Sequence, residues 1–74
     1  MIRNHIRECR VRHNGRGISM TRLAERIGVD RSYISKLEAG RRQPSARIVF
    51  AMARYFGCKV DELFEYVPDE KNAG

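Results

Sequence analysis

Cysteine, proline and long apolar runs are scarce in this chain of 74 residues, which contains two cysteines, two prolines and no tryptophan. Cys9 and Cys58 belong to no CxxC pair, so the disulfide framework of a small secreted domain is excluded and we expect two reduced thiols. No apolar run approaches the roughly 20 residues that a membrane span needs. Residues 1–7 also lack the apolar stretch of a signal peptide, so we expect a cytoplasmic protein without a membrane partner.

The length predicts one domain. A chain of 74 residues is too short for a nucleotide-binding doubly wound sheet or a barrel, which disfavours most cofactor-dependent enzymes. The serines and histidines have no spacing that suggests a catalytic triad. His5, Cys9 and His13 follow one helical line, but they offer only three ligands and Cys9 occupies an apolar stripe, which disfavours a metal site. We therefore expect neither an enzyme nor a cofactor.

Basic residues are in excess, with 15 Lys+Arg against 9 Asp+Glu, a net charge of +6 and a pI of about 10.0. Residues 1–17 and 18–47 each carry a net charge of +4, whereas residues 48–74 carry −2. A segregated basic surface favours a polyanionic partner, with nucleic acid before an anionic membrane. Charge alone does not choose between the two.

Short amphipathic segments, separated by glycine or proline, account for most of the chain. Apolar residues at helical spacing predict five helices, at 2–12, 20–27, 31–39, 46–56 and 60–64. Ser19, Asp30 and Ser45 are the expected N-caps, and Gly28 is the expected left-handed C-cap. Residues 65–67 can continue as an extended piece. We expect a folded domain over residues 1–67 and a flexible polar tail over 68–74.

The second and third predicted helices are joined by the three residues 28–30, which include a glycine. Two short helices with such a turn form a helix-turn-helix, whose second helix enters the DNA major groove. One face of segment 31–39 is basic and small, whereas Tyr33, Ile34 and Leu37 form its apolar face. Small side chains allow close approach to the bases, and long cationic ones can donate to guanine O6 and N7.

The run from Leu23 to Ser45, LAERIGVDRSYISKLEAGRRQPS, resembles the Cro and phage-repressor (Xre-type) helix-turn-helix regulators. The resemblance continues through Leu63-Phe64 and covers about residues 2–66. It implies an all-α, compact five-helix domain of the lambda-repressor type, with the helix-turn-helix formed by its second and third helices. This agrees with the five segments that the periodicity predicts.

The resemblance also implies roles for individual residues. The positions that match base-reading residues are Arg31, Ser32 and Lys36, with Ser35 and Tyr33 as weaker candidates. The positions that match residues near phosphates are Ser19, Thr21, Arg22, Arg41, Arg42 and Gln43. Arg10 and Glu38 match an internal ion pair that ties the first helix to the end of the recognition helix.

The sequence departs from the family pattern at two places. Met20 stands where the family commonly has a glutamine that bonds a DNA phosphate, and methionine has no donor. That contact is then lost or is made by Thr21 or Arg22. The loop at residues 14–17 is also longer than usual, and its Arg16 either adds a phosphate contact or is simply solvated.

These observations predict a regulator that binds double-stranded DNA in a sequence-specific manner. We expect a repressor that binds a two-fold operator as a homodimer, with a dimer interface at Leu63, Phe64, Tyr66 and Val67. The other interpretation of this apolar cluster is closure of the monomer core. The alternative function is an antitoxin-like module that neutralises a protein partner and autoregulates its operon.

Overall fold

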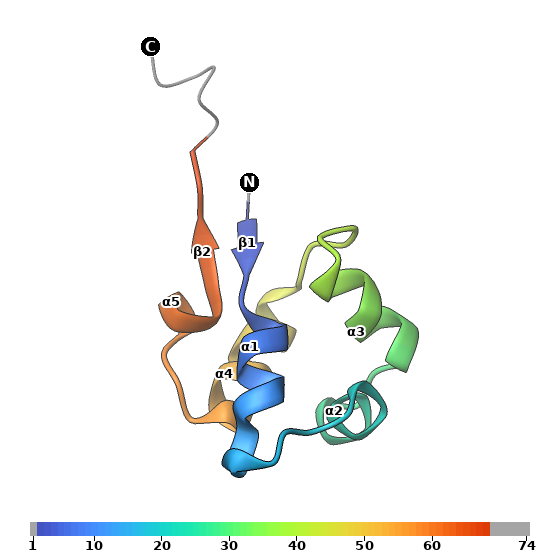
Figure 1. The fold of residues 1–74 in the computed structure, drawn as a ribbon. Coiled ribbons are helices and arrows are strands. Elements are labelled where there is room, and N and C mark those ends of the chain that lie inside the picture. The colour runs from blue at the N-terminus through green and yellow to red at the C-terminus, as the bar shows by residue number, and fades with distance from the viewer. Residues whose placement is uncertain (1, 69–74) are drawn as a thin grey trace.

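Helices surround the core, and the two ends of the domain meet in a small sheet (Figure 1). The structure is a computed structural model that describes residues 2–68. Within this range the helices are α1 (Ile6–Arg12), α2 (Met20–Ile27), α3 (Arg31–Glu38), α4 (Ala46–Phe56) and α5 (Val60–Leu63), with a 3-10 turn, η1 (His13–Gly15). The strands are β1 (Ile2–Asn4) and β2 (Phe64–Tyr66). The predicted all-α fold with a helix-turn-helix at α2 and α3 is confirmed, with the sheet as an addition.

Most helix ends lie where the capping residues placed them. The hydroxyls of Ser19 and Ser45 accept hydrogen bonds from backbone N–H groups of the first turns of α2 and α4. Gly28 ends α2 in the left-handed conformation, with φ of 84°. Asp30 occupies the N-cap position of α3 with extended backbone, but its side chain makes no capping hydrogen bond. The predicted position of the N-cap of α3 is therefore confirmed, but the hydrogen bond expected from the Asp30 side chain is not formed.

The first predicted helix is wrong at its N-terminal end, because residues 2–4 form a strand. Ile2 pairs with Tyr66 and Asn4 with Phe64 in antiparallel register, and the N–H of His5 donates to the carbonyl oxygen of Leu63 at 2.8 Å. The helical spacing of apolar residues in this segment is local information, whereas the strand partner lies at the other end of the domain. Hydrogen bonding to that partner decides the conformation.

The core is formed by one buried side-chain cluster to which every helix contributes. Its fully buried members come from α1, α2, α3, α4 and α5 and are Ile6, Leu23, Ile34, Leu37, Met52 and Leu63. At about 25 cal/mol per Å² of apolar surface, each such side chain contributes roughly 1.5–3 kcal/mol of transfer free energy. Because α3 buries only one face in this cluster, its other face remains at the surface. The predicted tail at 68–74 lies outside the described residues, apart from Pro68.

Candidate nucleic-acid interface

Helix α3 has two faces of different chemistry. Ile34 and Leu37 are buried, with 0% and 2% of their surfaces exposed. The side chains on the opposite face are exposed, and they are Arg31, Ser32, Ser35 and Lys36. Figure 1 shows α3 at the edge of the molecule, beside α2 and away from the sheet. The helix therefore presents two cations and two hydroxyls on a surface that its apolar face holds in place.

The turn between α2 and α3 is fixed by backbone hydrogen bonds. The N–H groups of Gly28 and Val29 both donate to the carbonyl oxygen of Ala24, at 2.8 and 2.9 Å. Val29 packs against the core, and the carbonyl oxygen of Asp30 accepts from the N–H of Tyr33 at 3.0 Å. The turn is thus anchored at both ends, which sets the orientation of α3 relative to α2.

Arg10 and Glu38, which the family resemblance implied as an ion pair, are brought together by the structure. Arg10 Nε donates to Glu38 Oε2 at 2.9 Å, and its second terminal nitrogen donates to Oε1 at 3.3 Å. The side chains are only 15% and 7% exposed. Arg10 also donates to the carbonyl oxygen of Ile18 at 3.1 Å, just before α2. One guanidinium therefore connects α1, the approach to α2 and the end of α3.

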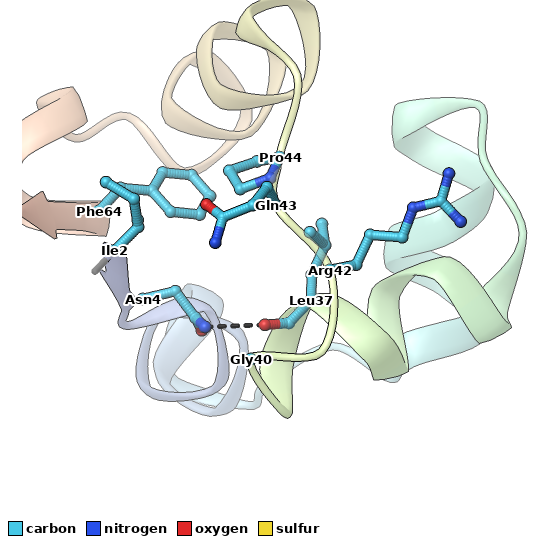
Figure 2. A pocket seen from close by; sticks show the side chains of 8 residues that line it. All are labelled: Ile2, Asn4, Leu37, Gly40, Arg42, Gln43, Pro44 and Phe64. Carbon is cyan, nitrogen blue, oxygen red and sulfur yellow. Dashed lines mark hydrogen bonds between the residues drawn. The ribbon is translucent and has the colours of Figure 1, made fainter.

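A second tie to the end of α3 comes from Asn4 in β1. Asn4 Nδ2 donates to the carbonyl oxygen of Leu37 at 2.8 Å (Figure 2). Asn4 Oδ1 accepts from the N–H of Ile6 at 3.3 Å. The Asn4 amide thus hydrogen-bonds both to an N–H at the start of α1, which has no partner within the helix, and to a carbonyl oxygen in the last turn of α3. The sequence pattern did not predict this role for Asn4. The only signal was an asparagine two residues before the first buried isoleucine of a helix.

The loop after α3 carries the next group of predicted DNA contacts. Arg41, Arg42 and Gln43 are all exposed. The guanidinium carbon of Arg42 lies 5.3 Å from the ring centroid of Tyr33, a cation–π contact across the loop. Arg42 lines one pocket with Asn4 and Leu37, and Figure 2 shows the guanidinium end of its side chain directed away from that pocket. Tyr33, which is half-buried, therefore lies under a cation of the loop.

The start of α2 places the remaining predicted contacts at the surface. Ser19, Thr21 and Arg22 are exposed. The Ser19 hydroxyl accepts from the backbone N–H of Arg22 at 3.1 Å, so its oxygen is already engaged as a cap. Met20, which stands where the family commonly has glutamine, is half-buried and packs against the core. The side chain at this position therefore has a packing role.

The longer loop before α2 folds against the end of α1. Gly17 has φ of 82°, and a Cβ at this position would lie 2.8 Å from the carbonyl oxygen of Val11. Only glycine fits this close approach. Arg16 beside it is exposed. The loop is thus held against α1 at Gly17, next to the exposed side chain of Arg16.

Comparison with known proteins agrees with this geometry. A family model described as helix-turn-helix matches residues 6–63, most of the chain. The chain belongs to the helix-turn-helix family. Over 69 residues, 93% of its length, it is 33% identical to an uncharacterised helix-turn-helix-type transcriptional regulator of Methanocaldococcus jannaschii, which is covered completely. Two such regulators of Archaeoglobus fulgidus are 35% and 33% identical over 93% of this chain and 94% and 93% of their own.

Family membership identifies this helix-turn-helix protein as a DNA-binding transcriptional regulator and not an enzyme. The resemblance to the Cro and phage-repressor type is confirmed at the level of the family. No helix within residues 2–68 is long and apolar enough to cross a lipid bilayer.

The C-terminal apolar cluster, for which the sequence predicted a dimer interface, divides into buried and exposed side chains. Leu63 and Phe64 are buried in the monomer, with 0% and 8% exposed. Their side chains belong to the monomer core, which agrees with the other interpretation of this cluster and leaves them with little surface to offer to a second subunit. Tyr66 is 71% exposed and Val67 is half-buried. The cross-strand partner of Tyr66, Ile2, is also exposed, at 37%.

The two histidines considered as metal ligands have other partners. His5 Nε2 lies 2.9 Å from Glu65 Oε1, which joins the start of α1 to β2. The ring of His13 stacks on that of Tyr55, with centroids 4.9 Å apart. Within residues 2–68, no group of three or more His, Cys, Asp or Glu side chains is arranged to hold a metal ion.

Proposed function

We propose that this protein recognises a specific sequence of double-stranded DNA, and that it does so as a homodimer on a two-fold operator. The observation that carries the proposal is the exposed face of α3, which combines Arg31 and Lys36 with the small hydroxyls of Ser32 and Ser35. In a helix-turn-helix this face enters the major groove. Long donors can reach guanine O6 and N7 there, while the small residues allow the helix to lie close to the bases.

Phosphate contacts surround that face in the proposed complex. Arg41, Arg42 and Gln43 follow α3, and Thr21 and Arg22 lie in the first turn of α2; all are exposed. Among residues 2–68, none of these arginines is in a salt bridge, so their charges are available to a polyanion. Neutralising phosphates releases counterions and supplies the affinity that is independent of sequence. The cation–π contact with Tyr33 restricts Arg42 before DNA arrives.

The surface that we assign to the dimer is the outer part of the sheet. Ile2 and Tyr66 are cross-strand partners and share one face, and both are large apolar side chains left exposed in the monomer. A two-fold pairing of this patch covers it. The two recognition helices are then expected about 34 Å apart, which matches half-sites one helical turn apart. A dimer on such an operator excludes polymerase from the same DNA, so repression is the expected outcome.

Selection of bound duplexes from a random library tests the proposed function. The full chain should enrich one motif with two inverted half-sites whose centres are about 10 base pairs apart. Enrichment of a single asymmetric half-site would contradict the homodimer. A library that shows no enrichment would contradict sequence-specific recognition and favour the antitoxin-like alternative, in which a protein partner is the main ligand.

A further inference from the structure

The two cysteines lie far apart in the sequence and share one surface pocket. Cys9 is in α1, and Cys58 follows the end of α4. Both line a pocket of about 350 Å³, together with His13 and residues 55–57. Each cysteine is half-buried and unbridged, and solutes can enter the surface pocket that both residues line. Neither belongs to α2, α3 or the loop after α3.

The two thiols are also near enough to influence each other electrostatically. The shared pocket places a thiol of α1 beside the connection between α4 and α5. Burial and the neighbouring Cys9 raise the pKa of Cys58 above its ordinary value of 9.0, which keeps Cys58 protonated at neutral pH. Because a thiolate is the attacking species, the raised pKa disfavours Cys58 as the first group to attack an oxidant.

Metal binding explains this pair poorly. A zinc site uses four ligands, or three and a water. His13 lines the same pocket, but its ring is stacked on Tyr55 and stands edge-on to Phe56, at 4.9 and 5.7 Å between centroids. No group of three potential ligands is formed within residues 2–68. Thiol–disulfide exchange is the chemistry that two cysteines in one pocket can support without a further ligand.

We propose that Cys9 and Cys58 form a reversible intramolecular disulfide by exchange with a low-molecular-weight disulfide such as oxidised glutathione. The Cys9 thiolate attacks one glutathione sulfur, breaks the S–S bond and releases one glutathione thiolate, which leaves a mixed disulfide on Cys9. Cys58 then loses its proton and attacks the Cys9 sulfur, which releases the second glutathione. The two protein thiols are oxidised, and one oxidised glutathione is reduced to two thiols.

This bond would close a ring that runs from residue 9 to residue 58 and contains α2, α3 and α4. A cross-link over so long a loop restricts the unfolded chain. The disulfide is therefore expected to raise the Tm of the domain by about 10 °C or more. In this account oxidation strengthens the fold that carries the recognition helix.

The test uses the reduced full chain under native conditions with excess oxidised glutathione. The proposal predicts that both thiols become unreactive to a thiol reagent, that the intact mass falls by two hydrogen atoms, and that the Tm rises. Dithiothreitol should reverse all three changes. Cys9→Ser and Cys58→Ser are the matched controls, since each retains one thiol and can form only a glutathione adduct or a dimer.

Either of two results would overturn the proposal. One is that both thiols stay reactive in the folded protein, with a bridge formed only after denaturation. The other is that the wild type accumulates two glutathione adducts or intermolecular dimers without an internal bridge. None of these measurements involves DNA, so the outcome is independent of the proposed function.

Discussion

Arg10 in α1 and Glu38 at the end of α3 form a two-point ion pair, with nitrogen–oxygen distances of 2.9 and 3.3 Å. The same guanidinium also holds the carbonyl oxygen of Ile18. Both side chains are largely shielded from solvent. The recognition helix is therefore fixed at its C-terminal end by a helix that carries none of the proposed base-reading residues.

Replacement of Arg10 should destabilise the fold, because it leaves the charge of Glu38 buried and unpaired. Arg10→Met leaves the Glu38 carboxylate, whose side chain is 7% exposed, without its counter-charge. We expect the free energy of unfolding to fall by about 3–5 kcal/mol. Urea denaturation measures this change, and Arg10→Met combined with Glu38→Leu should recover much of the loss because no charge is then stranded. A loss below about 1 kcal/mol, typical of exposed pairs, would show that the pair is solvated.

Asn4 can be tested by a nearly isosteric change. Asn4→Asp keeps an oxygen that can accept from Ile6 but replaces the donor to Leu37 by a second acceptor. We expect a loss of about 1–3 kcal/mol in the free energy of unfolding. Asn14→Asp is the matched control, since Asn14 lies on an exposed turn and makes only a 3.4 Å contact with His13. Equal effects of the two changes would refute the role of the Asn4 bond.

Arg31 should contribute to specificity more than to general affinity. Arg31→Ala is expected to cost about 1–3 kcal/mol on the selected DNA and to relax the base preference at one operator position. Competition binding with operators substituted at single positions measures both effects. Arg54→Ala removes the same charge from an exposed site on α4 and is the control. If Arg31→Ala weakens all DNA sequences equally, Arg31 contacts a phosphate.

Arg42 should behave in the opposite way. Arg42→Ala is expected to weaken binding to every sequence and to reduce the slope of log K against log salt by about one. Fluorescence anisotropy at several salt concentrations gives that slope. An unchanged slope would exclude Arg42 from the DNA footprint.

The proposed dimer depends on the exposed apolar pair of the sheet. Tyr66→Glu places a charge on the side chain that is 71% exposed, next to Ile2 on the same face. We expect the dimer dissociation constant to rise by about tenfold or more, because a charge in the centre of an apolar interface is desolvated. Sedimentation measures the constant, with Tyr66→Phe as the control. Removal of the whole C-terminal segment is unsuitable, since Leu63 belongs to the core. An unchanged constant would place the interface elsewhere.

The predictable part of the fold was the part determined locally. α2 and α4 have the predicted bounds, and α3 ends one residue earlier, because serine caps, glycine ends and apolar spacing all act within a turn or two. The strand at residues 2–4 was missed because its partner is β2, at the far end of the domain. The burial of Leu63 and Phe64 likewise depends on packing between distant segments.

The candidate site likewise has a part that could be predicted from the sequence and a part that depends on tertiary structure. The family resemblance pointed to the Arg10–Glu38 pair, and periodicity placed the small and basic residues of α3 on one face. Two contacts could not be predicted from spacing, the Asn4–Leu37 hydrogen bond and the position of Arg42 over Tyr33. Both depend on where β1 and the loop after α3 lie in three dimensions.

The central claim is that the exposed face of α3 reads base sequence. The most direct test is the affinity of the full chain for the selected operator compared with a scrambled duplex of the same length and composition, at physiological salt. We expect the operator to bind more tightly by about 10³-fold or more. Equal affinities for the two duplexes would contradict the claim and leave only non-specific binding to the phosphate backbone.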